Sequence, residues 1–247
     1  MIELFSLLLL LLVMAVLYSS VGHGGASGYL AAMAIYGLSP EIMKPAALVM
    51  NIAVSSLLIA RFSRAGNLNW RLIMPFIVLS IPFAYLGGGM QITDSWYFLL
   101  VGSALVVAAA WMIFKPKDRP PVTEAPPMLP MLLAGSGLGF VSGLTGVGGG
   151  IFLSPFLLLM RWADMRASAG IAAVFIWVNS VAGILGHLTK GNDWAAPVPV
   201  ALLVSLVVVG GYLGSELNLR CVRGETLRRL LGGVLVIAGV KMFGMAI

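Results

Sequence analysis

Charged residues are scarce in this chain of 247 residues: only 10% are Asp, Glu, Lys or Arg, whereas 60% are hydrophobic. A soluble domain carries about 25% charged residues, so this chain could not cover its own surface with polar groups. The composition excludes a cytosolic globular enzyme and a disordered chain. The 15 Lys and Arg residues outnumber the 9 Asp and Glu residues, which gives a net charge of +6. They are scattered singly between apolar runs, which excludes a nucleic-acid-binding module.

Residues that form cross-links or hold metals are almost absent. Cys221 is the single cysteine, which excludes a disulfide framework and a thiolate metal site built within one chain. His23 and His187 are the only histidines, and two imidazoles cannot make a structural zinc site. We therefore expect neither a metal nor a cofactor.

Ten apolar runs fill the sequence, and their lengths indicate membrane segments. Eight runs approach or reach the roughly 20 residues that a helix needs to cross a bilayer. The runs at 25–38 and 149–160 are shorter, as in re-entrant or half helices. The first run, at 4–20, lacks the basic leader of a signal peptide and is expected to be retained. With a mean hydropathy of +1.02, the chain is predicted to be an all-α polytopic membrane protein of about eight to ten segments.

The sequence repeats on either side of a proline-rich linker at 115–128. The following pairs recur in the same order: Ser20–Gly25 with Leu144–Gly149, Asn51 with Asn179, Gly66–Trp70 with Gly191–Trp194, and Tyr85–Gly87 with Tyr212–Gly214. We predict a duplication, with an N-terminal membrane repeat at 1–114 and a C-terminal membrane repeat at 129–247.

Basic residues predict the topology, because cytoplasmic loops of membrane proteins are enriched in Lys and Arg. If each half has five segments, one side receives twelve basic residues and the other receives three, Lys44, Lys190 and Lys241. Both termini then lie outside the cytoplasm, and the linker at 115–128 lies inside it. Because five is an odd number, the second half enters from the opposite face, which makes an inverted-topology repeat. Such repeats occur chiefly in transporters, whose substrate site lies near the midplane.

A glycine cluster precedes each of the two short runs. Within a membrane such a turn leaves backbone N–H groups without partners, so it persists only inside protein or beside a polar cavity. A helix N-terminus with free N–H groups and about half a positive charge is an anion site. We predict that the two turns face each other around one substrate. The predicted substrate-binding residues are Ser20, Gly22, His23, Gly24, Gly25, Asn51, Thr145, Gly146, Gly148, Gly149, Gly150 and Asn179.

These features also have structural interpretations. Glycines spaced by four, at 135, 139 and 143 and at 210 and 214, are expected to serve close helix packing. Asn51 and Asn179 could donate to an anion or could hydrogen-bond across helices. His23 could carry a proton, donate to an anion or bond a carbonyl group. His187 is expected to have a boundary role, because it lies at a membrane edge beside Lys190.

No Asp or Glu falls in the middle of an apolar run. Carboxylate proton relays, which are common in pumps, are therefore not expected. The absence of buried anions suits an anionic substrate, which carboxylates would repel. Because the cytoplasm is negative, the membrane potential drives a monovalent anion outward by about 2.3 kcal/mol per 100 mV. Export could run without a carboxylate relay, and coupling to a proton stays open.

The duplicated glycine motif and the Gly-Asn-x-x-Trp box at Gly66–Trp70 resemble the TauE/SafE sulfite exporter family. The second copy of the motif is Gly146–Gly150, followed by Pro155. The first copy is degenerate, because Ala26 replaces its third glycine and His23 intrudes. The resemblance covers nearly the whole chain. It implies a bacterial or archaeal inner-membrane permease for sulfite, sulfonates or other small sulfur-containing anions, with the motif glycines and both asparagines in the substrate site.

The sequence thus predicts a transporter that lies in membrane lipid and exports a small sulfur-containing anion. A carrier for another small anion or for a neutral organosulfur compound is the alternative, and a membrane scaffold is a more remote one. An enzyme is not expected. Ser20 near His23 is the sole candidate nucleophile with a base, and no carboxylate orients that imidazole.

Overall fold

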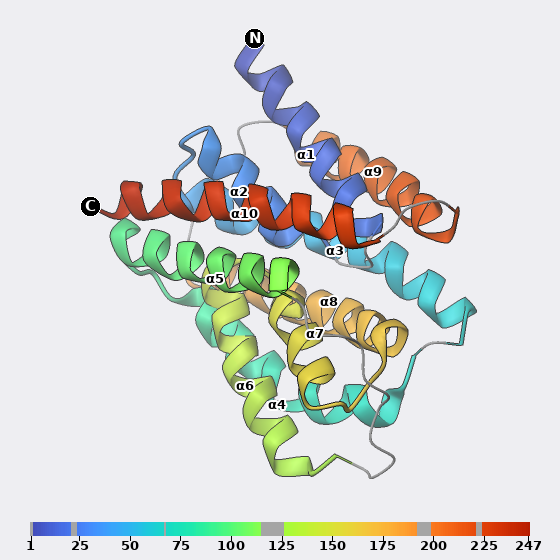
Figure 1. Cartoon of the computed structure of the whole chain (residues 1–247). Coiled ribbons are helices and arrows are strands. Elements are labelled where there is room, and N and C mark those ends of the chain that lie inside the picture. Colours follow the sequence, from blue (N-terminus) through green and yellow to red (C-terminus); the bar gives the residue numbers. More distant parts are fainter. Residues whose placement is uncertain (1, 21–23, 67, 115–125, 192–198, 221–223) are drawn as a thin grey trace.

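The computed structural model describes residues 2–20, 24–66, 68–114, 126–191, 199–220 and 224–247. Every regular element in these ranges is an α-helix (Figure 1), so the predicted all-α class is confirmed. The helices are α1 (Ile2–Ser20), α2 (Ala26–Ile35), α3 (Pro40–Arg64), α4 (Trp70–Gly89), α5 (Asp94–Phe114), α6 (Met128–Thr145), α7 (Gly150–Leu159), α8 (Met165–Thr189), α9 (Val200–Arg220) and α10 (Gly224–Ala246).

The first five helices and the second five follow the same succession of lengths. α1 and α6 have 19 and 18 residues, α2 and α7 have 10 each, and α3 and α8 have 25 each. α4 and α9 have 20 and 21 residues, and α5 and α10 have 21 and 23. α5 ends at Phe114 and α6 begins at Met128. The two series therefore meet at the predicted linker, of which residues 115–125 lie outside the described ranges.

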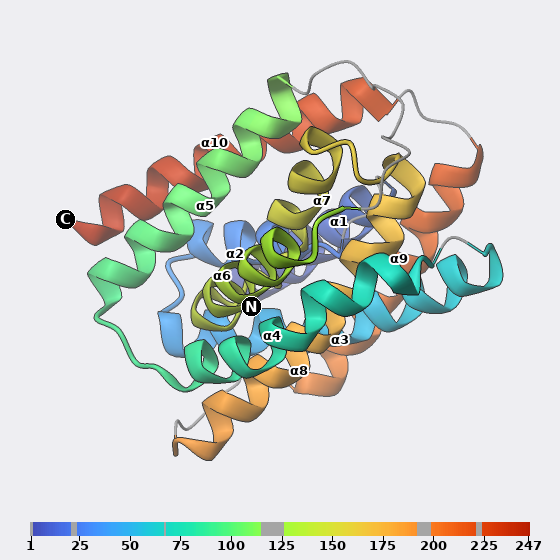
Figure 2. The ribbon, with the colours of Figure 1, turned by 90° about the horizontal axis from the view of Figure 1, so that it is seen from below.

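Two pairs of equivalent helices, α5 with α10 and α3 with α8, pack against each other. α5 and α10 lie side by side in Figure 1 and in Figure 2. A Cβ placed on Gly102 would lie 3.3 Å from Gly239 O, and one on Gly232 would lie 2.7 Å from Ile113, so α5 and α10 run antiparallel. α3 and α8 also run antiparallel, because the start of α3 and the end of α8 line one cavity. An inverted repeat requires this relation, but the inverted repeat itself stays a prediction.

Six helices are, by their described residues, long and apolar enough to cross a membrane: α1, α3, α4, α5, α6 and α8. α2 and α7 are shorter apolar helices, and the described apolar parts of α9 and α10 cover 200–216 and 231–246. Large hydrophobic side chains are exposed on the long helices, among them Phe5, Val78 and Phe114. Lipid covers such surfaces in a bilayer, and the chain is a multi-pass membrane protein.

Glycines on one face of α6 bring its backbone against that of α4. A Cβ placed on Gly135, Gly139 or Gly143 would lie 2.0–2.5 Å from a carbonyl oxygen of α4. The equivalent pair, α9 and α1, makes the same kind of contact, since a Cβ on Gly214 would lie 2.1 Å from Val16 O. No side chain fits at these distances, so the packing role predicted for these spaced glycines is confirmed.

We expect Gly143→Val to destabilise the protein, because its Cβ would lie 2.0 Å from Ala84 O. Overpacking of this kind costs about 1–3 kcal/mol or more. Thermal unfolding in detergent should therefore begin at a lower temperature than in the wild type. Gly137→Val is the matched control on the same helix, because a Cβ on Gly137 would meet nothing within 4 Å. Equal melting temperatures for the two variants would contradict the packing role.

Candidate functional site

The two short helices begin without a side-chain cap. α2 follows Gly25 (φ +88°) and α7 follows Gly149 (φ +71°), and both N-cap glycines adopt the left-handed region that favours glycine. By contrast, α4 and α8 are capped by Asn69 and Asp164, whose side chains accept hydrogen bonds from backbone N–H groups of the first turn. In the part of the chain that the structure describes, the backbone donors in the first turns of α2 and α7 therefore meet no side-chain acceptor.

These uncapped N-termini lie inside the protein. Every residue from Gly24 to Ala34 is buried, and so is every residue from Ser142 to Ile151. The first four N–H groups of a helix have no partner within the helix, and the helix dipole adds about half a positive charge at this end. Each short helix thus presents buried hydrogen-bond donors and positive potential, which together suit an anion.

The two glycine turns, far apart in the sequence, meet at Ile176 of α8 and Asn51 of α3. A Cβ placed on Gly24 would lie 3.1 Å from Ile176 Cδ1, and one on Gly150 would lie 2.4 Å from the same atom. A Cβ on Gly148 would lie 2.7 Å from Asn51 Nδ2, and one on Gly24 would lie 4.0 Å from Asn51 Oδ1. We call these five residues the central cluster. It unites one predicted asparagine with glycines of both predicted turns.

Asn51 and Ile176 occupy the same place in the two series. Each is the twelfth residue of a 25-residue helix, so both lie at the middle of a potential membrane span. Asn179, which the sequence pairs with Asn51, lies about one helical turn further along α8. Its Nδ2 donates to Phe175 O at 2.9 Å within the same helix. Position along the helix thus pairs Asn51 with Ile176, whereas the sequence match pairs it with Asn179.

Four buried polar atoms, one in the central cluster and three on α6 and α8, have no hydrogen-bond partner among the described residues. Asn51 Nδ2 donates to Gly146 O at 3.5 Å, but the Oδ1 atom of this fully buried residue accepts no hydrogen bond. Three further atoms share this property: Ser142 Oγ, Asn179 Oδ1 and Ser180 Oγ. Buried polar groups in proteins are normally satisfied. The unsatisfied Asn51 Oδ1 in the central cluster therefore marks a place that a polar ligand could occupy.

The other predicted site residues shape the turns. Ser20 Oγ donates to a carbonyl oxygen three residues earlier at 2.7 Å. Thr145 Oγ1 donates to the carbonyl four residues earlier at 2.6 Å and accepts from the N–H two residues later at 3.3 Å. Gly146 ends α6 in the left-handed region with φ +80°. Gly22 and His23 lie outside the described residues.

Ile176 is the member of the central cluster that sequence reasoning missed. A single isoleucine within an apolar run carries no chemical signal of its own. The signal was present in the repeat, because the boxes that begin at Gly66 and Gly191 differ by 125 residues. The same offset leads from Asn51 to Ile176 and matches the bounds of α3 and α8.

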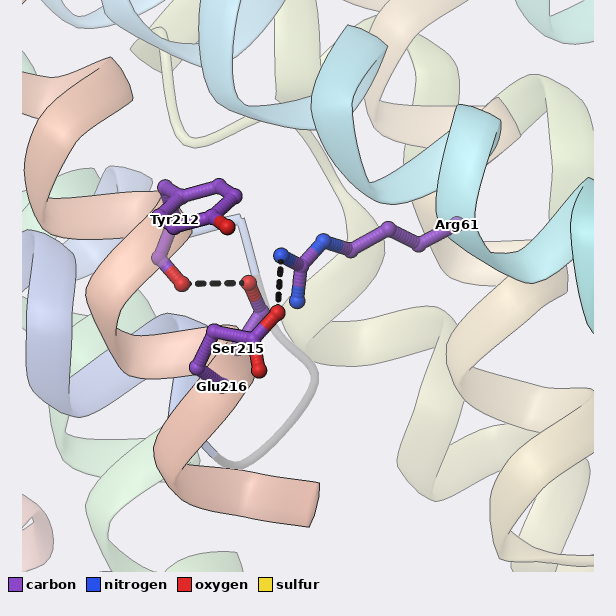
Figure 3. A network of polar contacts seen from close by, with 4 residues as sticks. All are labelled: Arg61, Tyr212, Ser215 and Glu216. Atoms are coloured by element: carbon purple, nitrogen blue, oxygen red, sulfur yellow. Dashed lines mark hydrogen bonds and ion pairs between the residues drawn. The ribbon is translucent and has the colours of Figure 1, made fainter.

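Equivalent helix pairs of the two series are held together by unlike contacts. At the end of α3, Arg61 Nη2 lies 2.8 Å from Glu216 Oε1 of α9, and the guanidinium lies over the Tyr212 ring, 4.8 Å from its centroid (Figure 3). The equivalent pair is α8 and α4, where a Cβ on Gly88 would lie 2.1 Å from Gly183 O. Long charged side chains thus join α3 to α9, whereas α8 and α4 touch through their backbones.

A multi-pass helical membrane protein with buried, uncapped helix ends at its centre has the architecture of a membrane transporter. The chain belongs to the family described as sulfite exporter TauE/SafE, which matches residues 7–242. It is accordingly a membrane transporter of this family, and the resemblance seen in the glycine motifs is confirmed.

Similar proteins come from bacteria and archaea. A probable membrane transporter protein of Sinorhizobium fredii is 36% identical over 234 residues, which cover 93% of this chain and 94% of the relative. A probable membrane transporter protein of Methanocaldococcus jannaschii is 28% identical over 199 residues, 74% of this chain and 72% of the relative. Another from Bacillus subtilis is 25% identical over 259 residues, 96% of this chain and 98% of the relative. No solved structure matches the chain.

Proposed function

We propose that this transporter carries a small sulfur-containing anion, such as sulfite or a sulfonate, through the central cluster. The observation that carries the proposal is the meeting of two uncapped helix N-termini, through Gly24, Gly148 and Gly150, at Asn51 and Ile176. Free backbone N–H groups and helix dipoles attract anions. Asn51 Nδ2 adds a side-chain donor at the same place.

The charges inside the protein favour an anionic cargo over a cationic one. Among the described residues no Asp or Glu side chain is buried, whereas Lys44 is. A buried carboxylate near the route would repel a sulfur oxyanion, and its absence removes that barrier. The oxygens of sulfite or of a sulfonate can accept hydrogen bonds from the backbone N–H groups that have no partner at the starts of the two short helices.

We place the protein in the inner membrane, with the linker at 115–128 in the cytoplasm and both termini outside, as the basic residues predict. In this orientation the membrane potential favours export of a monovalent anion by about 2.3 kcal/mol per 100 mV. An inverted repeat in one of its two states holds its halves in unlike arrangements. The unlike contacts of the pairs α3–α9 and α8–α4 support this mode of transport, in which 1–114 and 129–247 exchange arrangements.

The alternative cargo is another small anion or a neutral organosulfur compound in the same site. The unused N–H donors favour an anion, because a neutral compound gains little from the helix dipoles. A scaffold without transport has no need for paired, uncapped turns, and we assign the chain no catalytic role. Membrane lipid is its surrounding partner. His23, beside the first turn in the sequence, is the candidate for a coupled proton.

Flux of labelled sulfite through purified protein in liposomes tests the proposal. The assay compares two imposed membrane potentials and two pH gradients, with chloride, sulfate and taurine as competitors. We expect flux that follows the potential without a pH gradient. If a competitor is transported and sulfite is not, sulfite is rejected as the cargo and the proposed site is retained. Absence of flux for every solute would contradict transport through the central cluster.

We expect Asn179→Leu to lower the sulfite flux about fivefold more than Ser205→Leu does, the equivalent of about one hydrogen bond of 1 kcal/mol. Asn179 is fully buried in α8, and its Oδ1 is among the unsatisfied atoms. Ser205 is exposed, and its Oγ donates to Leu202 O at 3.0 Å in its own helix. Initial rates are compared at equal amounts of reconstituted protein. Equal effects of the two substitutions would assign Asn179 to helix packing.

A further inference from the structure

A polar cavity lies where α3 begins and α8 ends. Its volume is about 280 Å³, and its charged or titratable lining residues are Glu41, Lys44, Asp94, Tyr97 and His187. Lys44 and His187 are only 6% and 5% exposed, whereas Glu41 and Asp94 are exposed. The ammonium group therefore lies deep in the cavity, and the two carboxylates lie at its rim.

Within the described ranges, the Lys44 ammonium donates hydrogen bonds to backbone oxygens only. Its Nζ donates to Gly88 O at 2.8 Å and to Gly87 O and Met90 O at 3.3 Å, which are carbonyl groups at the end of α4. Among the described residues no carboxylate lies within 4 Å of this Nζ. The end of a helix supplies about half a negative charge. Lys44 therefore keeps an excess of positive charge in a buried place, where charges interact strongly.

The cavity adjoins the route to the central cluster. Lys44 and Asn51 lie on the same face of α3, two turns and about 10 Å apart, with Leu48 between them. Leu48 is fully buried and contacts Gly183 of α8, whose added Cβ would lie 3.4 Å from both Leu48 methyl groups.

The second glycine turn lies beside the same cavity, which Leu144 lines two residues before Gly146. Tyr97, which lines the cavity, donates its hydroxyl to Thr145 O at 3.0 Å. A Cβ placed on Gly146 would lie 3.0 Å from Lys44 O, so the turn packs on the backbone of the lysine. Two residues that line the cavity, Lys44 and Tyr97, thus contact the segment that leads into the central cluster.

We propose that this cavity is a second anion site on the transport route, where Lys44 binds the oxyanion on the extracytoplasmic side of Leu48. This inference rests on the proposed function. The ammonium exchanges one carbonyl oxygen of α4 for an oxygen of the anion, and the anion passes Leu48 between this site and the central cluster. The volume lies just below the range of about 300–1,000 Å³ typical of ligand pockets, which suits a small oxyanion.

The test measures initial sulfite flux against sulfite concentration in proteoliposomes. We expect Lys44→Met to raise the half-saturating concentration about tenfold, as loss of a charged hydrogen bond does, with the maximal rate within about twofold of the wild type. Lys44→Arg keeps the charge and should stay within about threefold of the wild type. Lys241→Met is the matched control: Lys241 also donates to a carbonyl at a helix end, Ile35 O, but it does not line the cavity.

A second variant separates anion binding from a purely structural role of Lys44 at the end of α4. Glu41→Gln removes an exposed carboxylate from the rim and should lower the half-saturating concentration about two- to threefold, an effect that salt screens. A structural role of Lys44 would leave this value unchanged. If Lys44→Met does not elute as a folded protein in size-exclusion chromatography, the half-saturating concentration of Glu41→Gln alone tests the second site.

The outcomes distinguish the two proposals. The second site would be overturned, and the proposed function left intact, if the wild type transports sulfite and Lys44→Met has an unchanged half-saturating concentration. Where only Glu41→Gln can be measured, an unchanged half-saturating concentration in that variant has the same meaning. A wild type that transports none of sulfite, sulfate, chloride and taurine would overturn both. Opposite shifts in the two variants, with normal behaviour of Lys241→Met, would establish the second site.

Discussion

Sulfite flux through the variant Gly149→Leu is expected to fall about a hundredfold or more, although the protein still inserts into the membrane. Gly149 has φ +71°, and its Cβ would lie 2.7 Å from Phe175 Cε1 and 3.3 Å from Ser142 Cβ. A leucine must therefore move the start of α7 away from the central cluster. Displacements near 1 Å at a functional centre can cost about a hundredfold in rate. The measurement is labelled-sulfite flux per reconstituted molecule.

Gly137→Leu on α6 is the control for Gly149→Leu. It adds the same side chain at an exposed glycine where a Cβ would meet nothing within 4 Å. We expect it to retain wild-type flux. Normal flux through Gly149→Leu would remove the second glycine turn from the transport route, while loss of flux in both variants would show that the assay responds to any added bulk.

Asn51→Ile is expected to lower sulfite flux by at least about tenfold. The substitution removes the Nδ2 donor that lies 2.7 Å from the Cβ position of Gly148 and leaves isoleucine on both sides of the central cluster. A hydrogen bond to a charged group contributes about 1.5–3 kcal/mol, and 1.4 kcal/mol corresponds to a factor of ten. Flux at the wild-type rate would place the anion elsewhere.

A double substitution turns the same position into a test of the duplication. Ile176→Asn combined with Asn51→Ile moves the amide from α3 to the equivalent residue of α8, at the twelfth position of each helix. If the halves are related by a pseudo-two-fold axis, the exchanged amide faces the same anion. We expect the double variant to recover at least about a third of the flux that Asn51→Ile loses, because total donor number is restored. A double variant no better than Asn51→Ile would contradict this relation.

Much of the helical architecture could be predicted because a bilayer restricts what a chain can do. Each crossing needs about 20 apolar residues, and the backbone must satisfy its own hydrogen bonds. The two short runs predicted at 25–38 and 149–160 form helices at 26–35 and 150–159. The first of these two helices, α2, ends earlier than its apolar run, because the backbone of Gly37, with φ +69°, leaves the helical region.

The candidate site was harder to predict, because its contacts join helices that are distant in the sequence. The sequence match pairs Asn51 with Asn179. In the structure, the residue at the same position along the equivalent helix is Ile176. Lys44 appears in the sequence only as a basic residue near a segment end. Its carbonyl partners lie 43 to 46 residues away in the sequence, so they cannot be predicted from local residue spacing.

If the two halves arose by the predicted duplication, the unlike residues at the centre, Asn51 and Ile176, have an evolutionary consequence. Duplication supplies two copies of every position, so one copy can diverge while the other retains the ancestral chemistry. Here one copy contributes polarity and the other contributes an apolar wall. A descendant can therefore acquire a different cargo preference by changing a single copy, without first giving up the amide that the other copy provides.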